Sequence, residues 1–230
     1  MPWFRLRNLP DGVGRRILLL WIADILVGIS YGAIAVAYGL SAWIPIVLAV
    51  TVVAGASEFV FVGVVAAGGS PLAAAAAGLL VNARHLPYGF AVSPLMPTFG
   101  SKLVGAHITN DESMVFALSQ RGFDAKKAAF WVCGLAILVS WSLGTIIGSL
   151  LGDVLHDVRA LGLDSVFPAA LVALIVPELR NKGMRGSALV GSLIAASTVW
   201  VLPVGLPELV ALGGLLALPV ASYFSRRSEM

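Results

Sequence analysis

The sequence predicts an all-α polytopic membrane protein with about seven to eight transmembrane segments, some of them broken or re-entrant. Hydrophobic residue types make up 59% of its 230 residues and charged types only 12%, whereas soluble domains contain about 45–50% and about 25%. A soluble fold of this size would lack the polar residues for a surface in water. The apolar residues also fall into separate stretches near the ~20 residues that cross a bilayer.

Eight apolar stretches are candidate membrane segments of a single transmembrane domain that spans residues 1–230. The first, second and fifth are clear. The third is interrupted by polar residues and Pro87, the fourth carries polar residues, and the sixth and eighth are short, so re-entrant segments could replace two crossings. The candidates are 17–40, 43–66, 72–96, 103–120, 128–151, 165–177, 187–202 and 207–223.

The basic residues predict the orientation. If all eight segments cross and the N-terminus is inside, 12 of the 15 Lys and Arg residues lie on the cytoplasmic side, as is typical of membrane proteins. We therefore expect cytoplasmic tails at 1–16 and 224–230. The same scattered distribution gives no basic patch for a nucleic acid, so we expect no nucleic-acid partner.

Several classes of protein and site are excluded. The N-terminal arginines precede an apolar run that continues to Leu40, which is too long for a signal peptide. One cysteine, Cys133, allows neither an intramolecular disulfide nor a Cys-based metal cluster. The three histidines lack the spacing of a metal site. The GxSxG pattern at 28–32 lies in a predicted helix, whereas an esterase elbow joins a strand to a helix, so we expect no enzyme.

Small residues predict helix contacts. Gly28 and Gly32 form one GxxxG pair, and Gly144, Gly148 and Gly152 form a double one. In lipid, small residues let two helix backbones approach closely. A loose similarity between 54–84 and 162–195 also suggests an internal repeat, as many transporters have.

Asp24 shares a predicted helix face with Gly28, Tyr31, Ala35 and Tyr38, at spacings of three and four. This small, polar and aromatic face is expected to point into the helix bundle. Two interpretations of Asp24 are open: it lines a cavity, or it lies near the membrane boundary and caps a neighbouring helix.

Ser57 and Glu58 follow three small residues inside the second apolar stretch. Small residues permit an unwound stretch whose backbone groups bind a polar solute, provided that it lines a cavity. Glu58 is a candidate to bind an ammonium group or a proton. The alternative is a structural ion pair with Arg84.

Asn82, Arg84 and His85 form the strongest polar cluster. Pro87 follows them and interrupts the helical hydrogen bonds. Arg84 supplies a permanent cation that can hold a carboxylate at two points, and His85 titrates near neutral pH. The alternative for Arg84 is a permanent pair with Glu58 or Asp111, and for His85 a purely structural role.

Asp111 and Glu112 are adjacent carboxylates, and on a helix they point about 100° apart, so at most one faces a given site. Both are candidates for a functional site inside the membrane. The alternative is that Thr109 or Asn110 caps a helix with these acids in its first turn.

The chain resembles the AzlC family, also called BrnF-type large subunits. The resemblance rests on five motifs that occur in the family's order along nearly the whole chain. They are an AGASQF-like motif, an Asn/Asp-x-Arg-His…Tyr-Gly motif, a Thr-Asp-Glu motif, a Ser-Trp…Gly-Thr…Gly stretch and a Leu-Pro-Ala-like segment, at 54–59, 82–89, 108–116, 140–148 and 161–170. Two departures stand out: Glu58 occupies a position where Gln is usual, and the Thr-Asp-Glu motif is stretched at 109–114.

The resemblance implies a secondary exporter of leucine, isoleucine, valine and often methionine in the bacterial inner membrane. It implies a small AzlD-type membrane subunit as partner, no cofactor, and the proton as coupling ion. For such a substrate we expect Arg84 to bind the carboxylate, Glu58 to bind the ammonium group or a proton, and Asp111 or Glu112 to take part in coupling. The alternatives are a scaffold subunit without transport activity and a channel for small zwitterions.

Overall fold

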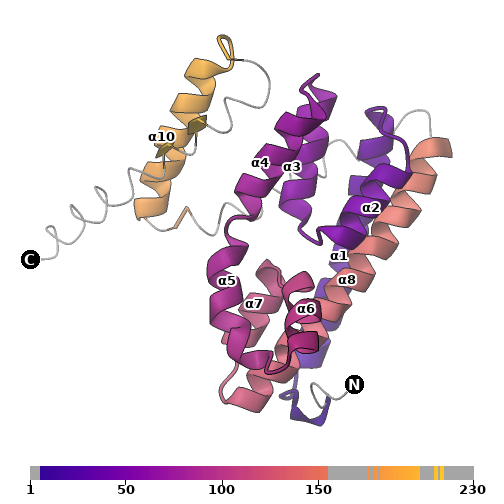
Figure 1. Cartoon of the computed structure of the whole chain (residues 1–230), viewed down its shortest axis with the longest axis vertical. Coiled ribbons are helices and arrows are strands. Elements are labelled where there is room, and N and C mark those ends of the chain that lie inside the picture. Colours follow the sequence, from indigo (N-terminus) through magenta and orange to yellow (C-terminus); the bar gives the residue numbers. More distant parts are fainter. Residues whose placement is uncertain are drawn as a thin grey trace, which may run out of the picture. The chain divides into compact units, whose positions relative to one another are not determined.

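The structure is a computed structural model that describes residues 6–154, 176, 179–180, 182–202, 210–211 and 213–214. The described residues form helices and no strand, as the sequence predicts (Figure 1). The elements are η1 Leu6–Asn8, α1 Val13–Ala37, α2 Trp43–Thr51, α3 Gly55–Ala66, α4 Pro71–Asn82, α5 His85–Val92, η2 Ser93–Leu95, α6 Phe99–His107, α7 Asp111–Leu118, α8 Phe123–Val154 and α10 Lys182–Thr198. The candidate segment 165–177, most of 207–223 and the tail 224–230 lie outside the described residues.

The chain divides into two compact units. The first comprises Met1–Glu58 and Val81–Val166, and the second comprises Phe59–Leu80 and Phe167–Met230. The first unit holds α1, α2, α5 to α8 and the first turn of α3, and every candidate site residue belongs to it.

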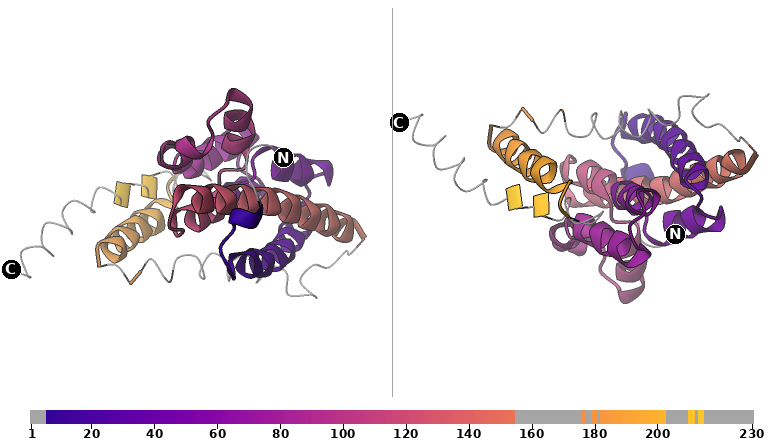
Figure 2. Two further views of the ribbon diagram at one scale, coloured as in Figure 1. Left: turned by 90° about the horizontal axis from the view of Figure 1, so that it is seen from below. Right: turned by 90° about the horizontal axis from the view of Figure 1, so that it is seen from above.

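α1 and α8 are long parallel helices that lie side by side in the first unit (Figure 1, Figure 2). Asp24 of α1 contacts Ser140 of α8, and further along both helices Ala33 of α1 approaches Gly152 of α8. The two helices therefore run in the same direction. Glycine makes this approach possible, because an added Cβ at several positions would strike the backbone of the other helix. These positions are Gly28, Gly32, Gly144, Gly148 and Gly152. The predicted GxxxG packing is therefore confirmed.

Both helices are long and apolar enough to cross a membrane. α8 has 32 residues, which is about 48 Å at 1.5 Å per residue and exceeds the ~30 Å hydrocarbon core. α1 begins at Val13 rather than at residue 17, since Val13 and Ile17 are both buried against α8 with Ala129 and Cys133. It ends at Ala37, because Gly39 adopts a left-handed φ of 88° that turns the chain.

The outward face of α1 carries large apolar side chains in place of polar ones. They are Leu18, Leu19, Ile22 and Leu26, each between 48% and 63% exposed. Such a face would be unfavourable in water and suits the hydrocarbon of a bilayer.

The six helices between α1 and α8 are about half as long as a membrane span. They have 8 to 12 residues each, which corresponds to about 12–18 Å. They form three consecutive pairs, and a short break separates the two helices of each pair. The breaks lie at 52–54 between α2 and α3, at 83–84 between α4 and α5, and at 108–110 between α6 and α7. Each predicted segment from the second to the fourth is thus broken near its middle.

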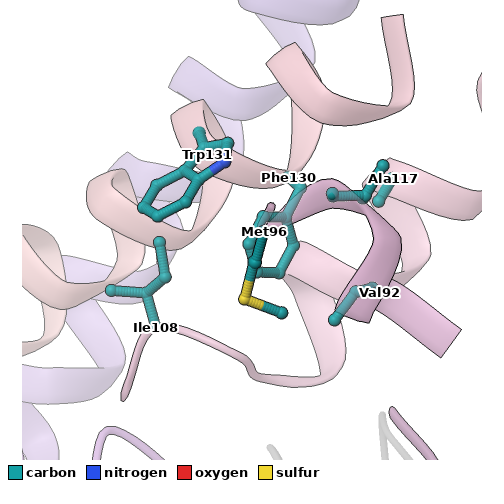
Figure 3. Close-up of a cluster of buried hydrophobic side chains, with 7 residues drawn as sticks. Val92, Met96, Ile108, Ala117, Phe130 and Trp131 are labelled. Atoms are coloured by element: carbon teal, nitrogen blue, oxygen red, sulfur yellow. The ribbon is translucent and has the colours of Figure 1, made fainter. Parts of the chain in front are cut away.

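A core cluster packs η2, α5, α6 and α7 onto the first half of α8. Figure 3 shows Ile108, from the break between α6 and α7, beside Trp131 of α8, with Met96 and Phe130 next to them. Gly134 makes room for this break, because a Cβ there would lie 2.8 Å from the Ile108 carbonyl oxygen. The break is therefore held by packing against a long, continuous helix.

In the second unit, α3 and α4 form a helical hairpin. Val64 of α3 is buried against Ala74 and Ala77 of α4. Further along the chain, α10 is approached by a short segment at Gly213–Gly214, where Gly214 lies against Gly191. Small residues thus mediate helix contacts in this unit as well.

The candidate segments 43–66 and 103–120 each contain two helices, in line with the unwound stretch expected near Ser57 and the cap expected at Thr109 or Asn110. One expectation needs correction. Tyr38 is 54% exposed and does not share the buried face of Gly28, Tyr31 and Ala35, because α1 ends before it. The break at Asn82–Pro87 is confirmed.

Candidate functional site

The break between α2 and α3 contains an unusual backbone conformation. Val53 has a φ of 53°, the one positive value of a non-glycine residue in the described parts. A β-branched residue rarely adopts this region, and the strain costs about 1–3 kcal/mol. Val53 is 2% exposed, so its buried side chain helps to hold the backbone there.

Glu58 closes the start of α3 with its own carboxylate. The Ala54 N–H donates to Glu58 Oε1 at 3.0 Å, and the Ser57 hydroxyl donates to the Ala54 carbonyl at 2.8 Å. The Trp141 indole N–H of α8 lies 3.1 and 3.0 Å from the two carboxylate oxygens. The predicted unwound stretch is present, and Glu58 occupies its free backbone donor.

Glu58 is buried, and neutral groups donate to its carboxylate. It is 1% exposed, and both the Ala54 N–H and the Trp141 indole N–H are uncharged. Tyr31 of α1, itself 0% exposed, stacks on Trp141 at 5.3 Å between ring centroids. The Trp141 ring also covers Gly55, where an added Cβ would lie 3.0 Å from it. No ion pair involves Glu58 in the part of the chain that the structure describes.

Arg84, between α4 and α5, pairs with Asp111 at the start of α7. Its Nε donates to Oδ1 at 3.1 Å and its Nη2 to Oδ2 at 2.8 Å, and the Tyr88 hydroxyl adds a 3.0 Å bond to Oδ1. The side chains are 29% and 44% exposed. Of the two alternative partners of Arg84, the structure selects Asp111 and not Glu58.

Asn82 and His85 present unused acceptors at the same break. With its proton on Nδ1, the neutral His85 ring presents Nε2 as an acceptor. His85 Nε2 and Asn82 Oδ1 are buried atoms without a hydrogen-bond partner among the described residues. His85 also meets Tyr88 edge to face at 5.6 Å.

Asn110 caps α7, which confirms one of the alternatives for this motif. Its Oδ1 accepts from the Ser113 N–H at 2.8 Å, and the Ser113 hydroxyl accepts from the Asn110 N–H at 3.0 Å. Asp111 and Glu112 occupy the first turn, where the helix dipole stabilises negative charge. Capping and function are compatible here, since Asp111 also holds Arg84.

Asp24 lies in the interface between α1 and α8. The Ser140 hydroxyl donates to its Oδ2 at 2.5 Å. The predicted inward face is thereby confirmed for Asp24, and its partner is a side chain of α8 and not a helix end.

The predicted site residues form three groups within the first unit. Arg84 and Asp111 meet directly, Glu58 joins the aromatic pair of Tyr31 and Trp141, and Asp24 joins Ser140. Trp141 was not a candidate from the sequence. A tryptophan in an apolar span is usually a lipid or core residue, and only the fold places its N–H on a carboxylate.

Together these groups supply what a zwitterion requires. Broken helices expose donors and acceptors at mid-span, where a continuous helix offers none. A guanidinium group and a helix N-terminus suit a carboxylate, and carboxylate, amide and imidazole acceptors suit an ammonium group. No group of three or more His, Cys, Asp or Glu side chains in the described residues could hold a metal ion.

Comparison with known proteins gives a family match and two relatives. The model of the AzlC protein family matches residues 20–155. The chain is 26% identical over 178 residues to the branched-chain amino acid transport protein AzlC of Bacillus subtilis (strain 168). The matched region covers 73% of this chain and 66% of that protein, so the chain spans just under two thirds of the relative's length. It is 27% identical over 227 residues to the inner membrane protein YgaZ of Escherichia coli (strain K12), which covers 91% and 89%. No solved structure matches.

Proposed function

We propose that this chain, which belongs to the AzlC family, is the large subunit of a secondary transporter that exports branched-chain amino acids. One observation carries the proposal: three successive membrane segments are broken at mid-span, and the buried or paired polar residues gather at these breaks. Discontinuous helices of this kind form substrate and ion sites in secondary transporters. The name of the Bacillus subtilis relative supports the choice of substrate.

The substrate carboxylate binds at the breaks that Arg84 and Asp111 connect. Arg84 has five N–H donors, of which three are occupied by Asp111 and the Val81 carbonyl. Two donors therefore remain for a ligand while the ion pair stays intact. The free acceptors on Asn82 and His85 suit the ammonium group, and the apolar side chains of the spans suit the aliphatic one.

Glu58 is the proposed proton site. Its carboxyl group is held by the neutral Ala54 and Trp141 donors, so it can gain or lose a proton without breaking an ion pair. The Ala54 N–H in the break between α2 and α3 donates to the Glu58 carboxylate. Protonation of Glu58 therefore changes a hydrogen bond that holds this break. The expected coupling ion is the proton, and Glu112 and Asp24 are further candidates on its path.

The chain acts in the bacterial inner membrane with a small AzlD-type subunit, which the family resemblance implies. α1 and α8 start at the same end of their pair, and Arg15, Arg16, Lys126 and Lys127 lie at these starts. The excess of positive charge supports a cytoplasmic location for this end, with the N-terminus inside.

The test is efflux of labelled leucine from cells that are loaded with a leucine dipeptide. Cells expressing the chain with its small partner subunit are compared with cells expressing the chain alone and the Arg84→Gln pair, each with and without a protonophore. Saturable efflux that needs both subunits and collapses with the gradient is expected. Efflux that does not saturate would indicate a channel, and unchanged efflux in the Arg84→Gln pair would place the substrate elsewhere.

A further inference from the structure

Asn110 carries a buried amide group that its capping role leaves unused. The cap engages its Oδ1 and its backbone N–H. Because Oδ1 accepts the Ser113 bond, the other end of the amide is the NH₂ group. Asn110 is 3% exposed, and its Nδ2 has no hydrogen-bond partner among the residues that the structure describes. Buried donors without a partner are rare in folded proteins and indicate a missing ligand or water.

The start of α6 shows that the cap itself does not require an amide. There the Thr98 hydroxyl accepts from the Ser101 N–H at 3.2 Å, and the Ser101 hydroxyl accepts from the Thr98 N–H at 2.9 Å. This is the same reciprocal arrangement as Asn110 and Ser113 form, built from a side chain without an NH₂ group. The extra donor at Asn110 therefore needs another explanation.

Two groups beside Asp111 suit an acceptor group that carries negative charge, while Glu112 adds a second carboxylate to the same turn of α7. Asn110 precedes Asp111, whose charge is already matched by Arg84 and the Tyr88 hydroxyl. The guanidinium group of Arg84 retains free N–H donors, and the N-terminus of α7 adds a partial positive charge. A carboxylate is the group that uses several such donors at once.

We propose that Asn110 is a substrate-binding residue whose NH₂ group donates to the carboxylate of the transported amino acid, and that the same carboxylate reaches the free donors of Arg84. This inference rests on the proposed transport function and deepens it. It predicts that the site distinguishes a free carboxylate from an amide, because an amide in the same place would supply a single acceptor oxygen and no charge.

Asn110→Thr separates binding from capping. Threonine keeps an oxygen for the Ser113 N–H, as Thr98 does for Ser101, and removes only the NH₂ group. The purified full chain, together with its small partner subunit in lipid nanodiscs, is titrated with leucine, with 4-methylpentanoate, which lacks the ammonium group, and with leucinamide, which lacks the carboxylate. Asn110→Thr should weaken the binding of both carboxylates by about tenfold or more and leave the binding of leucinamide and the thermal midpoint without ligand unchanged.

The matched control is Thr98→Ala, which removes the cap of α6. It should lower the thermal midpoint and leave the ratio of leucine to leucinamide affinity unchanged. The inference about Asn110 is overturned if Asn110→Thr binds leucine as the wild type does, if it weakens leucinamide equally, or if it only lowers the thermal midpoint, which would show a structural partner for the amide. Binding of 4-methylpentanoate but not leucine by the wild type would contradict the proposed substrate and still test Asn110. A wild type that binds no carboxylate would overturn both.

Discussion

Arg84 and Asp111 join two helix breaks through a two-point ion pair, with 3.1 Å from Nε to Oδ1 and 2.8 Å from Nη2 to Oδ2. Both side chains are partly exposed, at 29% and 44%, and two of the five Arg84 donors are free among the described residues, so a ligand can reach the guanidinium group while the pair stays intact. A loss of transport in an Arg84 variant therefore has two possible sources, the substrate contact and the pair with Asp111.

The first prediction separates these contributions with three variants. Arg84→Gln should reduce leucine affinity by about tenfold to a hundredfold, because a charged hydrogen bond to the carboxylate is lost. Asp111→Asn should reduce it much less, because Arg84 remains. Efflux and binding are measured for both and for the double variant. Equal losses in the two single variants, with no further loss in the double variant, would mean that Arg84 acts only through Asp111.

The second prediction concerns Glu58→Gln, which replaces a titratable group with a neutral one of nearly the same shape. The amide oxygen can still accept from the Ala54 N–H, so the protein should insert and keep its thermal midpoint. Efflux should lose its dependence on the proton gradient, because the proposed proton site is gone. Asp124→Asn, at an exposed position in the first turn of α8, is the control. Unchanged protonophore sensitivity in Glu58→Gln would assign proton coupling to another residue.

The third prediction concerns the indole N–H of Trp141. Trp141→Phe keeps an aromatic ring on Tyr31 and Gly55 but removes the donor to Glu58. Leaving a buried carboxylate short of a donor costs about 1–3 kcal/mol, so the thermal midpoint in detergent should fall. Trp200→Phe, at a side chain that is 90% exposed, should have little effect. Trp141→Phe should lower the thermal midpoint less in a Glu58→Leu background. An equal decrease there would show that the ring and not the N–H matters.

The sequence predicted the residues of the breaks better than the breaks themselves. Each of the polar clusters at 54–59, 82–89 and 109–113 lies at or beside a break. The local signals were the small residues before Ser57, the proline at 87 and a capping residue at 109 or 110. The start of the first break could not be predicted, because the residues up to Val53 are apolar and β-branched and continue the helical pattern. The capping of Ala54 by Glu58 and the cover from Trp141 are contacts across the fold, which periodicity does not reveal.

The pairing of the charged residues could not be predicted from the sequence either. Arg84 had two possible partners, and the choice of Asp111 depends on α7 lying beside α5. Thr109 or Asn110 was expected to cap a helix, but the choice of Asn110 and its buried, unused NH₂ group depend on the packing around it. By contrast, close helix packing at the glycines of α1 and α8 was predicted, since GxxxG spacing is typical of positions where two helices pack closely.

The fourth prediction tests that contact. A methyl group on Gly148 would overlap the Ile29 carbonyl of α1, so Gly148→Ala should push the helices apart and lower the thermal midpoint, with a cost of about 1–3 kcal/mol. Gly63→Ala is the matched control, since nothing lies within 4 Å of its added Cβ, and alanine favours a helix by about 1 kcal/mol over glycine. A Gly148→Ala protein as stable as the Gly63→Ala protein would contradict the packing of α1 on α8.

The fifth prediction concerns membrane topology, which follows from the parallel direction of α1 and α8. If both cross the membrane, their starts lie on one side, and the chain between them must cross an odd number of times. In a Cys133→Ala background, Asp11→Cys and Asp124→Cys place thiols at exposed positions near the two starts, and neither change removes a basic residue that sets orientation. Ser41→Cys, exposed just beyond the end of α1, reports the opposite side.

In intact cells, a thiol reagent that does not cross the membrane should label Ser41→Cys and spare Asp11→Cys and Asp124→Cys until the membrane is opened. This pattern would assign the basic end of α1 and α8 to the cytoplasm. Labelling of both aspartate positions in intact cells would keep the parallel pair and reverse its orientation. Opposite results at Asp11 and Asp124 would mean that α1 and α8 cannot both cross the membrane side by side in the same direction.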